Sequence, residues 1–168
     1  QPNIKTKLSI PTFDLANFCM SKANGSKIYL DNNKIFVTKN GNKHKEYSTI
    51  EIPRYLSVTK ELCYVLGVFV GDGWINKRNK YISFCFNTET GIESQNKVIE
   101  YMTSVGCVFS SIENQNGKKV NQIHFSNLAI HYLFKKIFSS YNYKPSSKSI
   151  PRFIFNLPED FKLEFIKG

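Results

Sequence analysis

The spacing of apolar and polar positions changes along the chain, and each change marks an element. Leu62 to Val70 is apolar on every side, which predicts a buried helix. Thr59 is a suitable N-cap for that helix, and Glu61 falls in the first turn, where the helix dipole favours an acid. In Tyr81–Asn87 apolar residues recur at every second position, which predicts a strand with one face toward a core.

Further helical and strand-like segments follow. We expect a helix near Glu93–Val105, strands near Cys107–Glu113 and Lys118–Phe125, and a helix over Leu128–Phe138. The order is helix, strand, helix, strand, strand, helix. This order predicts an α+β fold.

Residues 1–51 have a different character, polar and rich in turn signals. Asn24-Gly25 and Asn40-Gly41 are dipeptides typical of hairpin turns. Lys27-Ile-Tyr-Leu and Lys34-Ile-Phe-Val-Thr38 lie between them and predict two strands joined at Asp31-Asn32-Asn33. We interpret this segment as a small β-rich basic extension.

A short sequence recurs within the chain. Ile52-Pro53-Arg54-Tyr55 precedes the apolar helix, and Ile150-Pro151-Arg152-Phe153 precedes a second helix-like segment. Leu62-Cys-Tyr-Val-Leu-Gly67 likewise parallels Leu163-Glu-Phe-Ile-Lys-Gly168. We therefore expect a duplication, with one repeat over residues 52–149 and a second that begins at residue 150.

The chain is strongly basic, with a formal net charge of +10 and a pI of about 9.4. The excess is +5 in residues 1–56 and +5 in the remainder, so it is spread over the chain and not confined to a tail. Nucleic acid is the first candidate for a polyanionic partner. The alternative is the amino-acid bias of an AT-rich genome, because Lys, Asn, Ile, Phe and Tyr are all plentiful.

The cysteines and the apolar runs bear on metal sites and location. Cysteines 19, 63, 85 and 107 form no C-x-x-C pair and have no histidine at zinc-ligand spacing, so we expect reduced thiols, no structural zinc and an intracellular protein. The longest apolar run is about half the length of a membrane span, and no signal peptide is present. Because the chain begins at Gln1 and stops within a helix pattern, we expect it to be a proteolysed, split or truncated product.

The apolar helix carries a stripe of small residues and ends on an acid. Cys63, Gly67 and Gly71 are spaced four apart and share one face, which allows a second helix to pack closely. Asp72 follows at the helix C-terminus, where the dipole disfavours an anion. A divalent cation held by carboxylate and carbonyl oxygens offsets this cost. The alternative is that Gly71-Asp72-Gly73 is only a turn that ends a buried helix.

The segment Val65-Leu-Gly-Val-Phe-Val-Gly-Asp-Gly73 resembles the motif of the LAGLIDADG homing endonucleases. The resemblance implies an αββαββα half with a curved antiparallel sheet that binds the DNA major groove, and a pair of motif helices that each deliver one acid to the phosphates. By motif position it implies that Asp72 is the catalytic, metal-binding carboxylate and that the Gly71 carbonyl is a metal ligand for Mg²⁺ or Mn²⁺. The second motif begins at Ile166-Lys167-Gly168, and its acid would follow Gly168.

The resemblance also points to a lysine. Intein-type members of the family often carry one two residues before the Ile-Pro that precedes the second motif, which is Lys148 here. Such a cation would activate the attacking water or stabilise charge on the phosphate. The alternative is an ordinary surface lysine. The resemblance covers residues 52–168, and no splicing element is present.

Polar residues on the predicted strands and on the loop after the motif are candidate DNA contacts. Asn and Gln suit adenine and Lys suits guanine, whereas the loop lysines and arginine suit phosphates. Each residue taken alone has solvated surface as its alternative. Residues 1–51 are expected to add DNA contacts. The candidates are Asn76, Lys77, Arg78, Lys80, Ser83, Asn87, Lys118, Lys119, Asn121, Gln122 and His124.

Three functions are compatible with these patterns. The resemblance favours a metal-dependent endonuclease that cuts double-stranded DNA at a long asymmetric site, with a second LAGLIDADG half as partner. The second is a LAGLIDADG module that binds nucleic acid without cutting, as maturases and some transcription regulators do. The third is an inactive half whose glycine face only pairs with another chain.

Overall fold

The computed structural model describes residues 10–19, 26–39, 49–76, 78–113, 119–139 and 147–168. The N-terminal elements are short: β1 (Thr12–Asp14), α1 (Ala16–Cys19), β2 (Ser26–Asp31), β3 (Lys34–Lys39), β4 (Thr49–Pro53) and β5 (Tyr55–Ser57). Strands β2, β3 and β4 form one antiparallel sheet, and β1 pairs with β5.

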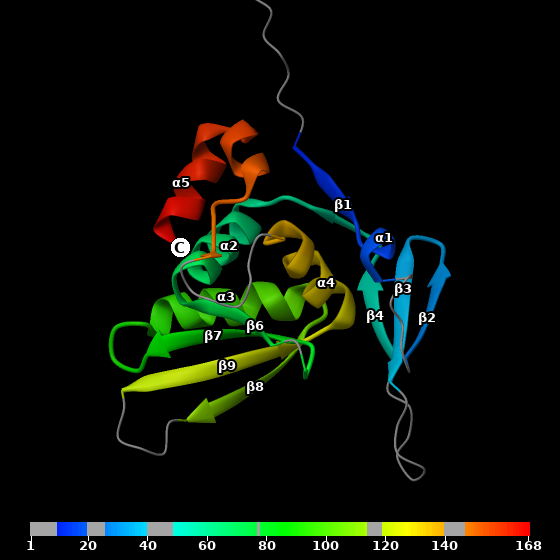
Figure 1. The fold of residues 1–168 in the computed structure, drawn as a ribbon, viewed down its shortest axis with the longest axis horizontal. Coiled ribbons are helices and arrows are strands. Elements are labelled where there is room, and N and C mark those ends of the chain that lie inside the picture. Colours follow the sequence, from blue (N-terminus) through cyan, green and yellow to red (C-terminus); the bar gives the residue numbers. More distant parts are fainter. Residues whose placement is uncertain (1–9, 20–25, 40–48, 77, 114–118, 140–146) are drawn as a thin grey trace, which may run out of the picture.

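The remaining elements have the order αββαββα, followed by a short C-terminal segment. They are α2 (Lys60–Asp72), β6 (Gly73–Asn76), β7 (Tyr81–Asn87), α3 (Ile92–Ser104), β8 (Val108–Glu113), β9 (Val120–Ser126), α4 (Leu128–Ile137), the 3₁₀ helix η3 (Arg152–Asn156) and α5 (Glu159–Lys167). Strands β6 to β9 form an antiparallel sheet of order β6-β7-β9-β8. Figure 1 shows α2, α3 and α4 on one side of this sheet. The fold class is α+β, as predicted.

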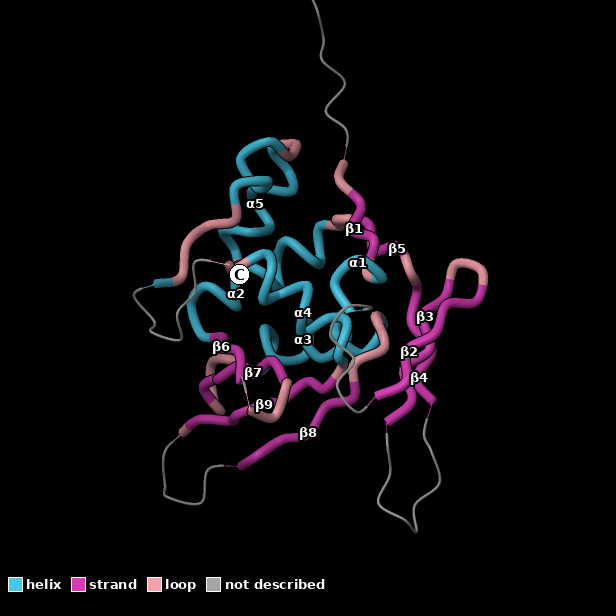
Figure 2. The backbone as a smooth tube through the Cα atoms, turned by 45° about the vertical axis from the view of Figure 1, so that its right-hand side comes forward, coloured by secondary structure: helices cyan, strands magenta, loops and turns pink. Residues whose placement is uncertain are grey.

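The strand register explains which face the helices cover. Ile75, Ile82 and Phe125 are cross-strand neighbours, and all three are buried in the core with Phe84 and Phe69 of α2. Paired residues in an antiparallel sheet point to the same side, so the alternate positions form the opposite, open face. Figure 2 shows the helices together on one side of β6–β9, with β2–β4 beside them.

Local signals located most elements of this unit correctly. Thr59 is the N-cap of α2, and its side chain accepts a hydrogen bond from the Leu62 amide at 3.2 Å. β7 has the predicted bounds, and the ends of the other predicted elements differ by at most two residues. The sequence pattern did not predict strand β6, because four residues are too few to show a period. Within the described residues, no helix is long and apolar enough to cross a membrane.

The hairpin of β2 and β3 confirms the strand prediction for residues 27–38. Its turn lies at Asn32, which has a φ of 51°, a conformation that asparagine adopts more easily than most residues. Asn24-Gly25 and Asn40-Gly41 lie outside the described residues. The two Ile-Pro-Arg sequences have different local structures: Ile52 is buried in β4, whereas Ile150 is exposed ahead of η3.

An ion pair joins β1 to the chain segment that leads into α2. The Arg54 guanidinium donates two hydrogen bonds to the Asp14 carboxylate, from Nε at 3.0 Å and from Nη2 at 2.8 Å. This contact with Arg54 holds the pKa of Asp14 below its usual value. The bidentate geometry orients both side chains.

We expect Asp14→Asn to lower stability at neutral pH and not in acid. Because the folded-state pKa of Asp14 is depressed, the stabilisation is present above the unfolded pKa of about 3.9 and is lost as pH falls through the folded pKa. Urea unfolding of both proteins from pH 7 to pH 2 measures this, and the two curves should converge in acid. A difference that stays constant over this range would contradict the ion-pair explanation.

Candidate functional site

Helices α2 and α5 cross in close contact at two glycines. A Cβ added to Gly67 would overlap the backbone carbonyl of Phe165, and one added to Gly168 would overlap that of Tyr64. The sequence alignment of the two helices pairs Tyr64 with Phe165 and Gly67 with Gly168. Gly67 thus lies against Phe165, and its counterpart Gly168 lies against Tyr64, the counterpart of Phe165. This reciprocal arrangement is expected around a twofold axis. The crossing supports the duplication predicted from sequence.

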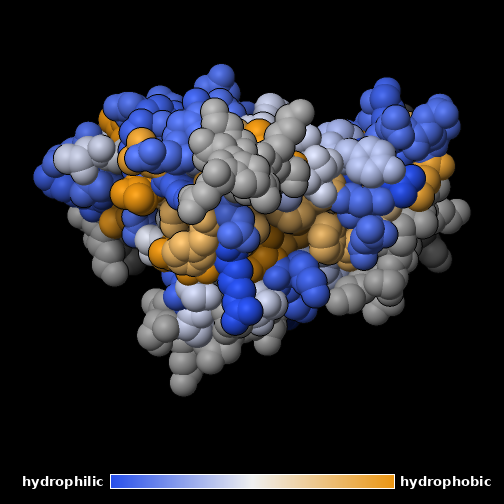
Figure 3. All heavy atoms as spheres, turned by 90° about the horizontal axis from the view of Figure 1, so that it is seen from above, coloured by the Kyte–Doolittle hydropathy of each residue, from blue (hydrophilic) through white to orange (hydrophobic). Residues whose placement is uncertain are grey.

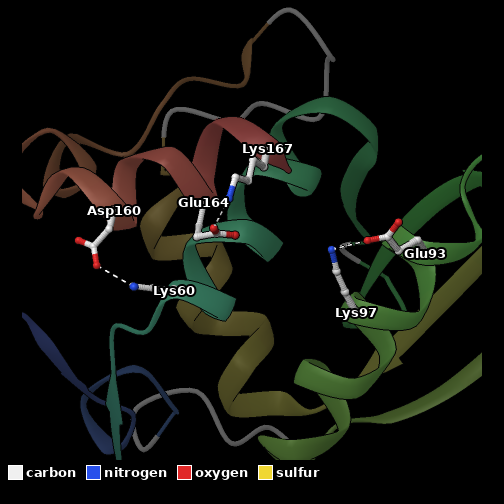
Figure 4. Close-up of polar contacts among 6 residues, drawn as sticks. All are labelled: Lys60, Glu93, Lys97, Asp160, Glu164 and Lys167. Atoms are coloured by element: carbon white, nitrogen blue, oxygen red, sulfur yellow. Dashed lines mark hydrogen bonds and ion pairs between the residues drawn. The ribbon is translucent and has the colours of Figure 1, made fainter.

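Polar contacts extend the helix pair away from the glycines. Lys60 of α2 and Asp160 of α5 form an ion pair at 2.7 Å, and Figure 4 shows their side chains pointing toward each other between the helices. Cys63 lies in the same region, where burial, followed by the charges of Glu61 and Glu164, raises its pKa to about 11. The Cys63 side chain is fully buried.

The third residue of the predicted stripe, Gly71, does not take part in this interface. A Cβ added there would meet no atom within 4 Å among the described residues, and Gly71 is exposed. Gly71 lies one helical turn beyond Gly67, the glycine at which α5 crosses α2. That Gly71 packs against a partner helix stays a prediction.

Asp72 is the last residue of α2 and its side chain is exposed. Its charge contributes to a raised pKa of Cys85, after burial as the main cause, so the carboxylate is near the open face of β7. Within the described part of the chain, no hydrogen bond or ion pair engages this carboxylate. Asp72 is therefore free to bind a ligand at the edge of the open face.

Lys148 lies at the same end of α2. Its Nζ donates hydrogen bonds to the carbonyl oxygens of Phe69, Gly71 and Gly73 at 3.1, 3.0 and 2.9 Å. Burial lowers the pKa of Lys148, and the nearby Asp72 carboxylate raises it to a smaller extent. The sequence singled out the right lysine as a neighbour of Asp72, but its ammonium faces the backbone.

These contacts change the predicted metal site. An ammonium has three N–H groups, and all three are directed at carbonyls, including the Gly71 oxygen that was predicted to bind metal. The exposed Asp72 carboxylate still fits Mg²⁺, which commonly binds through one or two carboxylates together with water and phosphate oxygens. No cluster of three or more His, Cys, Asp or Glu residues is found among the residues that the structure describes.

The open face of the sheet carries Trp74, Tyr81, Cys85 and Gln122, which are half-buried. Gln122 is the cross-strand neighbour of Cys85, the residue whose pKa the Asp72 charge raises. β6 places Trp74 on this face, and the sequence prediction missed it together with the strand.

Ser83 and His124 lie on the open face but are covered. The Ser83 side chain is 0% exposed and forms a 2.7 Å hydrogen bond with His124 Nδ1. The rings of Tyr81 and Trp74 lie against His124, with centroids at 4.5 and 6.3 Å, and burial lowers the pKa of the imidazole. The prediction that Ser83 contacts DNA directly is wrong, because these aromatic neighbours exclude it from the surface.

Two of the predicted asparagines stabilise turns. Asn76 Oδ1 accepts from the Asn79 amide at 2.9 Å, and its Nδ2 donates to the Tyr81 hydroxyl. Asn87 Oδ1 accepts from the amides of Glu89 and Thr90. These local hydrogen bonds occupy the carboxamide oxygens that would accept a hydrogen bond from the adenine amino group.

The remaining candidates fall into four groups. Arg78 is exposed and Lys80 half-buried on the turn between β6 and β7, where Lys80 has a φ of 54°. Asn121 lies on the helix-covered face and donates to Gln95 of α3, so its predicted contact with DNA is wrong. Lys119 is exposed and paired with Glu89 at 2.5 Å. Lys77 and Lys118 lie outside the described residues.

Comparison with known proteins adds little to this geometry. No family model matches the chain. The chain is 27% identical over 150 residues to Uncharacterized protein MJ1054 of Methanocaldococcus jannaschii. The match covers 80% of this chain but only 16% of that protein, so the chain spans less than a fifth of its relative's length. No activity follows from this similarity.

Proposed function

We propose that this chain is one half of a LAGLIDADG-type DNA endonuclease, with Asp72 as the metal-binding carboxylate. The observation that carries the proposal is the exposed Asp72, which has no hydrogen bond or ion pair among the described residues, at the end of a helix that crosses its counterpart through reciprocal glycines. The αββαββα order and the open antiparallel sheet beside Asp72 agree with what the sequence resemblance implies. The net charge of +10 suits a DNA partner.

The second half is part of the proposal. Leu163 and Ile166 of α5 are 49% and 77% exposed, whereas the corresponding Leu62 and Val65 of α2 are 1% and 0% exposed beneath the sheet and helices of their own half. An equivalent half built on α5 would bury the two exposed side chains in the same way. Viewed from above, Figure 3 shows apolar side chains gathered in the middle of this side of the molecule. The half could come from the same polypeptide, a separate chain or a second copy.

The roles of the described residues follow from their positions. An Mg²⁺ or Mn²⁺ ion bound at Asp72 would stabilise negative charge on the phosphate and lower the pKa of a bound water. Asp72 would hold the ion against the DNA backbone. Gln122 would contact a base edge, and Arg78 and Lys80 would hold phosphates farther along the sheet. Because the N–H groups of Lys148 are engaged by backbone carbonyls, the predicted phosphate contact of Lys148 is not part of the proposal.

The decisive experiment is Mg²⁺-dependent cleavage of a plasmid library with randomised inserts, using this chain together with a second half. Recovery of one enriched long site among cut plasmids, and none with EDTA or Ca²⁺, is the expected result. Without a second half, we expect this chain to make no double-strand break. Enrichment of bound but uncut DNA in every divalent cation would reject the nuclease.

DNA that is bound but not cut would instead support the second candidate, a nucleic-acid-binding module that does not cut. One observation favours it: Lys148 already places a positive charge at the Gly71 carbonyl. The same surface would then bind DNA or RNA without cleavage. A chain that sediments unchanged with either nucleic acid would exclude both candidates.

Gln122 and Asn121 provide a matched pair of variants, since they are adjacent on β9 and face opposite sides of the sheet. We expect Gln122→Ala to weaken binding of the selected site by about 1–3 kcal/mol, the value of one base contact, and to relax preference at one base pair. Asn121→Ala should leave DNA affinity unchanged, as measured by fluorescence anisotropy at fixed salt. Equal losses for both variants would show that the open face does not read bases.

A further inference from the structure

Three backbone carbonyl oxygens converge at the C-terminal end of α2. Those of Phe69, Gly71 and Gly73 all lie 2.9–3.1 Å from one point, the Nζ atom of Lys148. The Phe69 carbonyl also accepts a hydrogen bond from the Gly73 amide, the Gly71 carbonyl belongs to the last turn of α2, and the Gly73 carbonyl belongs to β6. The last turn of a helix is the negative end of its dipole. The ring of Phe69 is 5.8 Å from the same nitrogen and adds a cation–π contact. Each of these features favours a positive charge at this point.

The ligand set selects the kind of cation. The three oxygens belong to neutral peptide groups and surround a centre at about the N–O distance of an ammonium hydrogen bond. Mg²⁺ requires oxygens at about 2.0–2.1 Å in octahedral arrangement, which these positions do not provide. Rings of backbone carbonyls do replace the hydration shell of K⁺ in proteins. The geometry therefore matches a monovalent cation of ammonium or potassium size.

We propose that the carbonyls of Phe69, Gly71 and Gly73 form a monovalent-cation site that Lys148 fills from within the chain. Lys148 follows the three carbonyl residues by 75–79 positions in the sequence, so its ammonium links a distant segment to the last turn of α2. Lys148 thereby fixes the backbone on both sides of Asp72, which makes it a positioning residue. The inference concerns folding and cation binding, and it stands whether or not the protein cuts DNA.

Removal of the lysine side chain should open the site to free cations. We expect Lys148→Ala to lower the thermal midpoint by roughly 5–10 °C in tetramethylammonium chloride, since three charge-assisted hydrogen bonds are lost. NH₄⁺ and K⁺ at the same ionic strength should restore at least half of that loss. Tetramethylammonium has the same charge but is too large to enter, so it controls for screening.

Matched variants separate this site from general salt effects. Lys97 makes an exposed ion pair with Glu93 (Figure 4), and Lys97→Ala should show no difference between NH₄⁺ and tetramethylammonium. Lys148→Met keeps the stem of the side chain in place, so it should be destabilised without rescue by either ion. The unchanged protein should have the same midpoint in both salts.

The results distinguish the possibilities clearly. Selective rescue of Lys148→Ala by NH₄⁺ and K⁺ supports the site, and equal midpoints in all three salts overturn it. If Lys148→Ala does not fold in tetramethylammonium chloride, the refolding yield from urea is measured in the same salts. A yield that recovers only with NH₄⁺ or K⁺ supports the proposal, and a yield that is equally low in all of them rejects it.

Discussion

Replacement of Asp72 by Asn should reduce Mg²⁺-dependent DNA cleavage at least about 10³-fold, equivalent to about 4 kcal/mol of transition-state stabilisation. The amide has nearly the shape of the carboxylate but lacks the charge that holds a divalent cation. Because the Asp72 carboxylate makes no hydrogen bond or ion pair within the described residues, the substitution should leave the fold unchanged. Loss of activity would then report on chemistry and not on folding.

Asp31→Asn is the matched control for this experiment. Asp31 is an exposed residue of β2 in the N-terminal sheet, and its replacement changes the net charge by the same amount. Cleavage of the selected plasmid should be unaffected by Asp31→Asn, and DNA affinity should be retained by both variants. Equal cleavage by the Asp72→Asn variant and the unchanged protein would remove Asp72 from the mechanism.

Substitution of Gly67 by Ala should destabilise the protein by about 3 kcal/mol, measured by urea unfolding. The added methyl group would occupy the position of the Phe165 carbonyl, so α2 and α5 would have to move apart. Backbone cannot rotate out of the way as a flexible side chain does. The overlap should outweigh the gain of about 1 kcal/mol that alanine normally brings to a helix interior.

Gly71→Ala is the control and should have the opposite sign. It is on the same helix, one turn later, and an added Cβ meets no described atom within 4 Å. We therefore expect a gain of about 0.5–1 kcal/mol from helix propensity alone. Gly168→Ala would overlap Tyr64 from the other helix and should resemble Gly67→Ala. If Gly67→Ala and Gly71→Ala had the same effect, the close crossing would be disproved.

The elements that could be predicted are those with strong local signals. The α2 helix has an N-cap and an apolar run, and β7 has seven alternating residues, so neither depends on distant parts of the chain. The αββαββα unit was one strand short because the four residues of β6 resemble a loop. The fold class and most boundaries were therefore within reach of local patterns.

Errors in the candidate site arose where distant residues decide the outcome. Alternation placed Ser83 on the open face, but Ser83 is buried there beside its cross-strand neighbours Trp74 and His124. The carbonyls around Lys148 come from residues 75–79 positions earlier, beyond the range of any periodic pattern.

The open space at Gly71 has a practical consequence. α2 is in close contact with α5 at Gly67, whereas at Gly71, one turn later and directly before the exposed carboxylate, an added Cβ meets no atom of the described residues within 4 Å. A reporter group attached at residue 71 would thus sit next to the proposed chemistry without entering the helix crossing. The arrival of a metal ion or a DNA duplex at Asp72 would become visible by fluorescence from a single labelled position.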